Sequence, residues 1–582
     1  MIKKLARCIR EYKKTSILTS LFVALEVILD VLMPYLVSDL IDNINSATGI
    51  KMPVVVKIGI ILILMAGLSI VFGILSGINC AKASTGFAKN LRKDMYYKIQ
   101  NFSFYNIDKF STTSLVTRLT TDVSFVQMAY QMIIRIAIRS PLMLIFTLIM
   151  TFTINVKLAL IFLIAGPILF LGLMIIFKKV HPTFLKVIKE YDDLNNVVQE
   201  NVRGARVVKA YVREDHEIKK FGVTSDLIYK DYSRARKLLA FNSPLMQFTV
   251  YTCMLLVCFF GAHLIVTSGS TELTTGELTT MFAYTMQILM SLMMFSMVVV
   301  NIAISRASAE RIIEILDEVP NIKNPAKPVM KVKNGEIIFK NVSFSYTGDI
   351  SKLCLKDVDL KIKSGQTIGI LGGTGSSKST LISLIPRLYD ATSGKVLIGG
   401  VNVKDYDLKV LRDAVSVVLQ KNVLFSGTIK ENLRWGNEHA TDKEIEHACR
   451  LACADEFIQK FPDKYDTHIE QGGSNVSGGQ KQRLCIARAL LKKPKILILD
   501  DSTSAVDTKT DAMIRKAFRE EIPNTTKIII AQRVSSVQDA DKIIILEGGK
   551  IIAHGNHKEL LSNCEIYKEI YTSQTTNKGG KK

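Results

Sequence analysis

The chain has 582 residues, of which 48% are hydrophobic and 22% are charged, and its mean hydropathy is positive. This length predicts two or more domains. The hydropathy excludes an ordinary soluble protein, because long apolar segments fill the first 305 residues, whereas the remainder has the composition of a soluble α/β domain. The net charge of +22 does not indicate nucleic acid, because its excess in the first half flanks apolar segments.

Six apolar segments are long enough to cross a bilayer as helices, which takes about 20 residues each. They lie at 17–37, 55–78, 136–154, 157–177, 245–267 and 279–304. Lys and Arg are concentrated in the N-terminus and in the connections 79–135 and 178–240, whereas the other connections carry at most one base, Lys51. Since basic loops stay in the cytoplasm, we predict a multi-pass protein of the cell membrane with a cytoplasmic N-terminus.

The two basic connections are too long to be simple turns, and both contain helix-favouring stretches, at 89–99 and 187–208. These stretches predict that membrane helices continue far into the cytoplasm. Each extension ends in a short break with aromatic and charged residues, at 102–106 and 210–215. We interpret both tips as contact surfaces for another domain; the alternative is a pair of solvated helical hairpins.

Charged residues inside a membrane span are costly and require an explanation. Glu26 and Asp30 are four residues apart in the first span and therefore share one face of a helix. One interpretation is that they recognise a cationic substrate in a cavity open to the cytoplasm. The alternatives are an ion pair with Arg135 or Arg139, near the start of the third span, or contact with trapped water.

The sixth span is rich in methionine, whose flexible thioether suits a pocket that accepts several apolar molecules. Packing between helices and contact with lipid are equally good interpretations. The residues concerned are Met281, Met286, Met290, Met293, Met294 and Met297.

Prolines among charged residues mark a linker at 317–333, because proline interrupts helices. The resulting domains are a membrane domain at 1–316 and an α/β domain at 334–573. A polar, basic tail at 574–582 is predicted to be disordered. After the linker, the runs 336–339 and 342–346 have strand character.

The segment 368–380, IGILGGTGSSKST, leads from an apolar strand through a glycine-rich turn into a helix. Such a turn directs backbone N–H groups and a helix N-terminus at a polyanion, which predicts a phosphate-binding loop. Lys378 would contact the outer phosphates of a nucleotide, and the Ser379 hydroxyl would hold Mg²⁺. Ser377 stands where the pattern has glycine, at a cost of about 1 kcal/mol if φ is positive there. The loop residues assigned to nucleotide binding are Gly372, Gly373, Thr374, Gly375, Ser376, Ser377, Lys378, Ser379 and Thr380.

Three further sequence features are candidates for the same nucleotide-binding site as this loop. Tyr346 precedes it and could stack on an adenine; the alternative is an ordinary strand tyrosine. The run KILILDD at 495–501 predicts a buried strand ending at Asp500, whose carboxylate is placed to hold Mg²⁺ through water. Ser477 opens a long helix, whose N-terminus predicts a second site that attracts anions.

With these motifs in one chain, residues 330–573 resemble the nucleotide-binding domain of the ATP-binding cassette (ABC) family. Ser477, Gly478, Gly479 and Gln480 match its signature motif, Gln420 looks like its Q-loop glutamine, and Ser504 to Asp507 look like its D-loop. The resemblance implies ATP and Mg²⁺ as cofactors, with Gln420 at both the metal and the catalytic site. The whole chain resembles an exporter half-transporter: a membrane domain of six helices with long cytoplasmic extensions, of the exporter (type IV) kind, fused to a cytoplasmic α/β P-loop domain.

The departures from the family pattern concern catalysis. A glutamate that polarises the attacking water usually follows the Asp500 position, but this chain has Asp501. Gln532 replaces the switch histidine, and Gln471 stands where exporters often have glutamate. Because a misplacement near 1 Å can slow such a reaction about 100-fold, the resemblance implies a site that binds ATP well and hydrolyses it poorly.

Members of this family pair head to tail, so each ATP lies between one chain's phosphate loop and the other chain's signature. An intact signature with altered catalytic positions resembles one subunit of heterodimeric bacterial multidrug exporters. It implies a second half-transporter as partner, hydrolysis mainly at the partner-side site, and an amphipathic small molecule as substrate. The alternative assembly is a slow homodimer.

Other functions stay open. A lipid or peptide exporter has the same spans, and an ATP-binding regulatory or channel-type subunit tolerates altered catalytic positions. A soluble ATPase that acts on nucleic acid or ribosomes is disfavoured by the six spans in the same chain.

Overall fold

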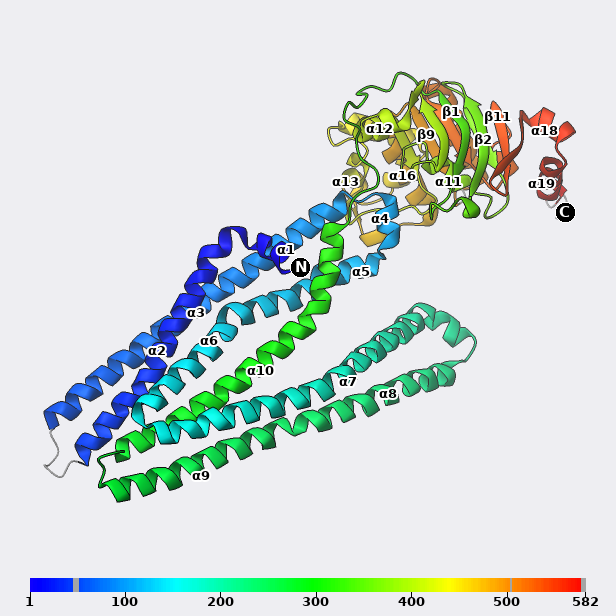
Figure 1. The fold of residues 1–582 in the computed structure, drawn as a ribbon. Helices are drawn as coiled ribbons and strands as arrows, with labels where there is room; N and C mark the ends of the chain where they lie inside the picture. The colour runs from blue at the N-terminus through cyan, green and yellow to red at the C-terminus, as the bar shows by residue number, and fades with distance from the viewer. Residues whose placement is uncertain (46–51, 503–504, 577–582) are drawn as a thin grey trace. The chain divides into compact units, whose positions relative to one another are not determined.

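Figure 1 shows the computed structural model, which describes residues 1–45, 52–502 and 505–576. Lys51, the D-loop residue Ser504 and the tail residues 577–582 lie outside these ranges. The described chain forms two compact units. Residues 1–100 and 111–318 make up a helical unit, and residues 101–110 and 319–582 make up an α/β unit. A short piece of the first cytoplasmic connection therefore belongs with the α/β unit.

The helical unit contains, in chain order, α1 (Ile2–Ala6), η1 (Arg7–Tyr12), α2 (Lys13–Ile44), α3 (Met52–Gln100), α5 (Thr112–Thr117), η2 (Arg118–Asp122), α6 (Val123–Ile154), α7 (Val156–Ala210), α8 (Glu214–Ala240), α9 (Asn242–Ser268) and α10 (Thr275–Asp317). Within the described residues, six helical stretches are long and apolar enough to cross a membrane. The six predicted spans lie in α2, α3, α6, α7, α9 and α10, one in each, which confirms the predicted membrane helices.

The end of α2 and the start of α10 approach each other closely. A Cβ at Gly276 would overlap the Ser38 carbonyl oxygen, and the Gly276 N–H donates to Asp42 at 2.9 Å. Further along, the Tyr284 hydroxyl donates to the Val31 carbonyl at 2.8 Å. Polar groups inside a bilayer need such partners because no water reaches them. These contacts hold α10 beside α2, and α6 packs against both.

Two helices continue well past the length of a membrane span, as predicted: α3 runs to Gln100 and α7 to Ala210. The tip at 102–106 leads into α4 (Phe104–Lys109), which Ser103 caps through a capping box with Asn106. The second tip, 210–215, is the turn between α7 and α8. Its role as a contact surface stays a prediction.

The α/β unit is built on two main sheets and a small one. The largest has the strand order β12-β11-β3-β10-β9-β6, and its neighbours are parallel apart from the antiparallel pair β11 and β12. The order β2-β1-β4-β5 forms an antiparallel sheet, and β7 pairs with β8. The strands are β1 (Ile337–Phe344), β2 (Leu355–Ile362), β3 (Thr367–Leu371), β4 (Ser393–Ile398), β5 (Val401–Asn402), β6 (Val415–Val418), β7 (Gly427–Thr428), β8 (His468–Ile469), β9 (Ile496–Asp500), β10 (Thr526–Ile530), β11 (Lys542–Glu547) and β12 (Lys550–Gly555).

Strands β9 and β10 are buried along their whole length, as expected of parallel strands covered on both faces. The helices of this unit are α4, η3 (Ile350–Lys352), α11 (Lys378–Ser383), η4 (Val403–Asp405), α12 (Leu408–Ala414), α13 (Ile429–Arg434), α14 (Asp442–Leu451), α15 (Asp455–Ile458), η5 (Lys464–Asp466), η6 (Gln471–Gly473), α16 (Gly478–Leu491), α17 (Thr508–Glu521), η7 (Val534–Ser536), α18 (His557–Asn563) and α19 (Glu565–Thr576).

The two predicted strand runs, 336–339 and 342–346, fall mainly within a single strand, β1, which ends at Phe344. Its pairing with β2 and with β4 changes register midway, where Asn341 has φ +47°. A bulge of this kind interrupts the alternation of side chains, which explains why the sequence pattern reads as two runs.

The prediction of a disordered tail is wrong for residues 574–576. They form the end of α19, because Gln574 has specific partners: its side-chain oxygen accepts from the Val534 N–H at 2.8 Å, and its Nε2 donates to the Gln532 carbonyl at 2.9 Å. These two hydrogen bonds tie the C-terminal helix to the segment that follows β10.

Candidate functional site

Three adjacent parallel strands bring the phosphate loop and the predicted catalytic residues to one edge of the large sheet. Ile370 of β3 pairs with Ile530 of β10, which pairs with Asp500 of β9. The carboxyl ends of these strands are therefore in line, and the phosphate loop, Gln532 and Asp501 follow them directly. This edge is the usual ligand site of parallel α/β sheets.

The phosphate loop connects β3 to α11 and wraps around the Lys378 ammonium group. Lys378 Nζ donates to the carbonyl oxygens of Gly372 at 2.9 Å and Gly373 at 2.8 Å, and to Ser376 Oγ at 3.2 Å. Burial lowers the pKa of Lys378, and the nearby Asp500 and Asp501 oppose that shift. A phosphate in this loop would meet a partly buried cation, whose charge water screens less than at the surface.

Ser377 has φ +70° and ψ +26°, in the left-handed region. The sequence expectation that a side chain at this position is strained therefore applies, at about 1 kcal/mol. The loop nevertheless keeps a shape in which its neighbours bind the lysine, so the missing glycine does not abolish the loop.

The residues predicted to hold Mg²⁺ supply suitable donors. Burial raises the pKa of Asp500, and a hydrogen bond with Ser379 opposes that shift. Gln420 is hydrogen-bonded to Asp501. Carboxylate, hydroxyl and amide oxygens suit Mg²⁺. Among the described residues, no three His, Cys, Asp or Glu side chains are grouped so that they could hold a metal alone. The donor set therefore fits a Mg²⁺ ion shared with phosphate groups.

Asp501 and Gln532, which the sequence predicts at altered catalytic positions, contact each other. Gln532 Nε2 donates to Asp501 Oδ2 at 2.9 Å, and the Asp501 N–H donates to the Ile530 carbonyl at 3.0 Å. Burial raises the pKa of Asp501, whereas Lys378 and Gln532 act to lower it. An amide does not titrate near neutral pH, unlike an imidazole. This pair can therefore orient a water molecule, but Gln532 cannot exchange a proton with it.

Tyr346 lies just after β1 and reaches the helix that begins at the phosphate loop. Its hydroxyl is hydrogen-bonded to Thr380 Oγ1 at 3.0 Å, and its ring meets those of Phe344 and Tyr389 edge-on, with centroids 4.8 and 5.2 Å away. The Tyr346 side chain is 41% exposed. A ring fixed in this way and still open to solvent is suited to stacking on a base.

Tyr389 also contacts α4, which makes the first cytoplasmic tip a contact surface for the α/β unit, as predicted. Its hydroxyl donates to Asp108 Oδ2 at 2.5 Å, and its ring lies 6.0 Å from that of Phe104. Burial and the hydrogen bond to Asp108 raise the pKa of Tyr389. Sequence reasoning missed Tyr389 and Asp108, because no motif marks a residue pair 281 positions apart.

The signature residues form the N-terminus of α16. Ser477 is the N-cap: its Oγ accepts from the Gln480 N–H at 3.3 Å, and Gln480 Oε1 accepts from the Ser477 N–H at 2.8 Å. Gln482 Oε1 accepts from the Ala505 N–H at 3.1 Å, which joins this helix to the D-loop. The N-terminus of α16, which the sequence predicts to attract an anion, is therefore formed.

In the helical unit, Arg139 of α6 pairs with both Glu26 and Asp30 of α2; its distance to Asp30 is 2.9 Å. Asp30 also accepts a hydrogen bond from Ser69 of α3 at 2.9 Å. The ion pair that the sequence left open as an alternative is thus present. Recognition of a substrate by these two carboxylates stays a prediction.

The fold and the site together define a multi-pass membrane transporter with a cytoplasmic ATP-binding domain. Residues 16–292 match the ABC transporter transmembrane region, and residues 355–504 match the ABC transporter domain. The chain belongs to the ABC transporter family, as the relatives described below show over most of its length.

Two relatives from Bacillus subtilis (strain 168) are similar to most of the chain. The uncharacterized ABC transporter ATP-binding protein YfiB is 39% identical, with 90% of each chain covered. A second such protein, YknU, is 36% identical over 83% of this chain and 82% of its own. The solved structure of a bacterial Atm1-family ABC exporter with ATP bound has the same fold, with a TM-score of 0.84 and 23% identity over 97% of this chain and 99% of its own.

Proposed function

We propose that this chain is one subunit of an ATP-driven exporter of amphipathic small molecules. Its own ATP site binds nucleotide but hydrolyses it slowly. A second half-transporter supplies a competent site, which Ser477 to Gln480 of this chain complete. The observation that carries the proposal is the contact between Asp501 and Gln532 at 2.9 Å.

This contact favours binding over turnover. The Asp501 carboxylate is one methylene shorter than glutamate and is engaged by the Gln532 amide. Gln532 is itself held through its carbonyl by Gln574 at 2.9 Å. General-base catalysis depends on a carboxylate within hydrogen-bond reach of the water, and an error near 1 Å costs about 100-fold.

The binding side of the same site is complete. Lys378, the loop backbone and the α11 N-terminus are arranged to attract phosphates, and Tyr346 is open to a base. Mg²⁺, when bound, supplies positive charge that offsets the phosphates, and Ser379, Asp500 and Gln420 would hold it. ATP in this pocket therefore mainly stabilises the contact between two nucleotide-binding domains.

The link to the membrane domain runs through α4. Asn106 Nδ2 donates to the Val319 carbonyl at 3.2 Å, and Asp108 accepts from Tyr389. Movement of the nucleotide-binding domain on closure would thus be passed to the helices α3 and α5, between which α4 lies in the chain.

The test compares two variants in the transporter purified from membranes and reconstituted in lipid vesicles. Ser477→Arg blocks the partner-side site, so we expect ATPase activity to fall about 100-fold. Lys378→Ala weakens only this chain's own site, so we expect a loss of about tenfold or less. ATP-driven uptake of a fluorescent dye into inside-out vesicles is measured in parallel.

Lys363→Ala, which removes an exposed lysine of the same domain, is the control and should behave as the unmodified protein. Equal and complete loss of ATPase activity in Ser477→Arg and Lys378→Ala would contradict the division of labour between the two sites. Strong ATPase activity of this chain without any partner would contradict the heterodimer.

A further inference from the structure

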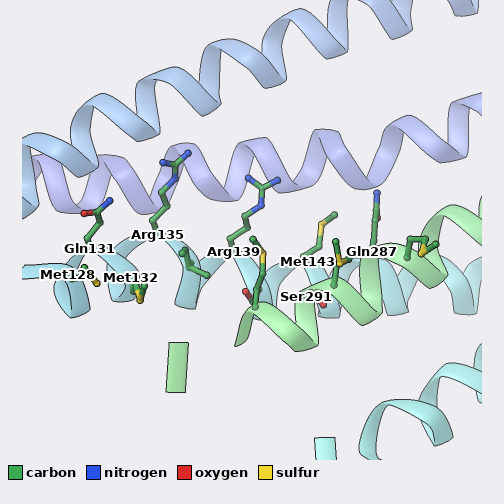
Figure 2. Close-up of a pocket in the computed structure, with 13 residues that line it drawn as sticks. Met128, Gln131, Met132, Arg135, Arg139, Met143, Gln287 and Ser291 are labelled. Carbon is green, nitrogen blue, oxygen red and sulfur yellow. The ribbon is translucent and has the colours of Figure 1, made fainter. Parts of the chain in front are cut away.

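The helical unit contains a cavity of about 740 Å³ between α6 and α10. Its wall is dominated by thioethers from both helices, four of which are more than 40% exposed: Met128, Met286, Met290 and Met294. Figure 2 shows the α6 and α10 side chains that line it. A volume of this size and a largely apolar lining suit a small organic molecule, and flexible methionines adapt to different shapes.

The cavity also has unused hydrogen-bond donors. Arg135 lines it and, among the described residues, makes no hydrogen bond or ion pair; its Nη1 lies 3.8 Å from where a Cβ at Gly77 of α3 would be. The Ser140 hydroxyl lines the same cavity, is 2% exposed and has no hydrogen-bond partner in the structure. An unpaired charge within a membrane span requires a functional explanation.

The second cavity arginine differs from the first. Figure 2 shows Arg135 and Arg139 extending from α6 toward α2, but Arg139 forms ion pairs there with Glu26 and Asp30. Asp30 is also tied to Ser69 of α3, and Glu26 lies against Gly73 of α3. Neither carboxylate lines this cavity. Among the described residues that line the cavity, Arg135 is therefore the charged side chain without an ion-pair partner.

We propose that this cavity binds an amphipathic organic anion, with its acidic group on Arg135 and Ser140 and its apolar body on the methionines. This assignment rests on the proposed export function and names the substrate class. It opposes the cationic substrate that Glu26 and Asp30 alone suggest, because both carboxylates are already engaged by Arg139. A soluble organic acid and an acidic phospholipid share this chemistry.

The test measures binding without ATP, on the full-length chain purified from membranes with any half-transporter that remains bound, in nanodiscs of phosphatidylcholine. The probes are fluorescein, an anion, and a rhodamine methyl ester, a cation with the same xanthene framework. Fluorescence polarisation should show fluorescein binding at least about tenfold more tightly, since a hydrogen-bonded charge contributes roughly that much.

Arg135→Gln should weaken fluorescein binding about tenfold without weakening rhodamine binding, and Arg135→Lys should keep most of the affinity. Ser140→Ala should cost less than Arg135→Gln. Arg203→Gln makes the same change of charge at an exposed position of α7 and should leave both affinities unchanged. Added phosphatidylglycerol that displaces fluorescein identifies a lipid as occupant, and absence of displacement identifies a soluble acid.

Tighter binding of the rhodamine, no binding of either dye, or equal fluorescein affinity in Arg135→Gln overturns the assignment. These outcomes are distinct from failure of the export function. If fluorescein binds through Arg135 but ATP drives no dye across the membrane, the export proposal fails and the site stands. If ATP drives the cation and not the anion, the export proposal stands and the substrate class fails.

Discussion

The phosphate-binding end and the catalytic end of the ATP site occupy similar positions in the fold, but their side chains form different contacts. The phosphate loop and the residues Asp501 and Gln532 follow neighbouring parallel strands, so the same sheet edge places both. At the phosphate end, Lys378 is held by the loop with three hydrogen bonds of 3.2 Å or less. At the catalytic end, the amide of Gln532 donates a hydrogen bond to the short carboxylate of Asp501.

This difference separates binding from turnover on physical grounds. Phosphate binding depends on many backbone N–H groups and one cation, so it survives the replacement of a single glycine by Ser377. In the proposed function, turnover depends on the placement of one carboxylate relative to one water molecule, so a change of one methylene slows it. A domain can therefore lose hydrolysis while it keeps nucleotide affinity.

The largest expected effect comes from restoring the catalytic end. The double variant Asp501→Glu with Gln532→His should raise hydrolysis at this chain's own site about 100-fold, because the longer carboxylate reaches the water and the imidazole can hold it. The measurement is single-turnover ATP hydrolysis in a transporter whose partner-side site is blocked by Ser477→Arg.

Asp501→Asn with Gln532→His is the matched control, since it changes the same positions without supplying a carboxylate, and it should show no gain. If the double variant hydrolyses ATP no faster than the parent, Asp501 and Gln532 do not limit hydrolysis at this site, which contradicts the proposed function.

The phosphate end of this site could be predicted from local sequence, and Asp501 and Gln532 from the family resemblance, whereas contacts between distant segments could not. The glycine pattern and Lys378 lie within one short segment, and even the positive φ of Ser377 follows from its place in that pattern. The contact of Tyr389 with Asp108 joins distant segments and has no local pattern. The same holds for Gln574, whose polar surroundings in the sequence indicate a disordered tail, although its side chain is fixed by the segment after β10.

The membrane helices were predictable for a related reason. Their length and composition are set by the bilayer, so each of the six spans is visible by itself. The partner of Glu26 and Asp30 was open between Arg135 and Arg139, because both lie on one face of α6, one turn apart. The packing of α2 against α6 places Arg139, and not Arg135, beside the two carboxylates. Arg135 therefore lines the cavity and, within the described part of the chain, has no ion pair.

A smaller effect on ATPase activity is expected when the contact between Tyr389 and α4 is weakened. Tyr389→Phe removes the hydroxyl that donates to Asp108 at 2.5 Å and keeps the ring beside Tyr346. A hydrogen bond to a charged group contributes about 1.5–3 kcal/mol, and this one is exposed, so the lower end of that range applies. Transport-stimulated ATPase activity should therefore fall about tenfold. ATP affinity should change little, because the aromatic contacts remain.

Tyr389→Leu, which also removes the ring, should in addition weaken ATP binding through Tyr346. Asp108→Asn keeps an acceptor oxygen and should have a smaller effect than Tyr389→Phe. A Tyr389→Phe variant with full stimulation by transported dye would show that this contact is structural only. Both quantities are measured on the reconstituted transporter, with a fluorescent ATP analogue for affinity.

The smallest expected effect concerns the phosphate loop itself. Ser377→Gly should stabilise the loop by about 1 kcal/mol, because glycine adopts φ +70° without the clash that a Cβ introduces. Ser377→Ala keeps the Cβ and should give no such gain, so the pair isolates the backbone cause. The check is thermal unfolding of the full-length chain with and without ATP. A gain in both variants would assign the effect to the Ser377 hydroxyl, and a gain in neither would mean that the strain is relieved elsewhere in the loop.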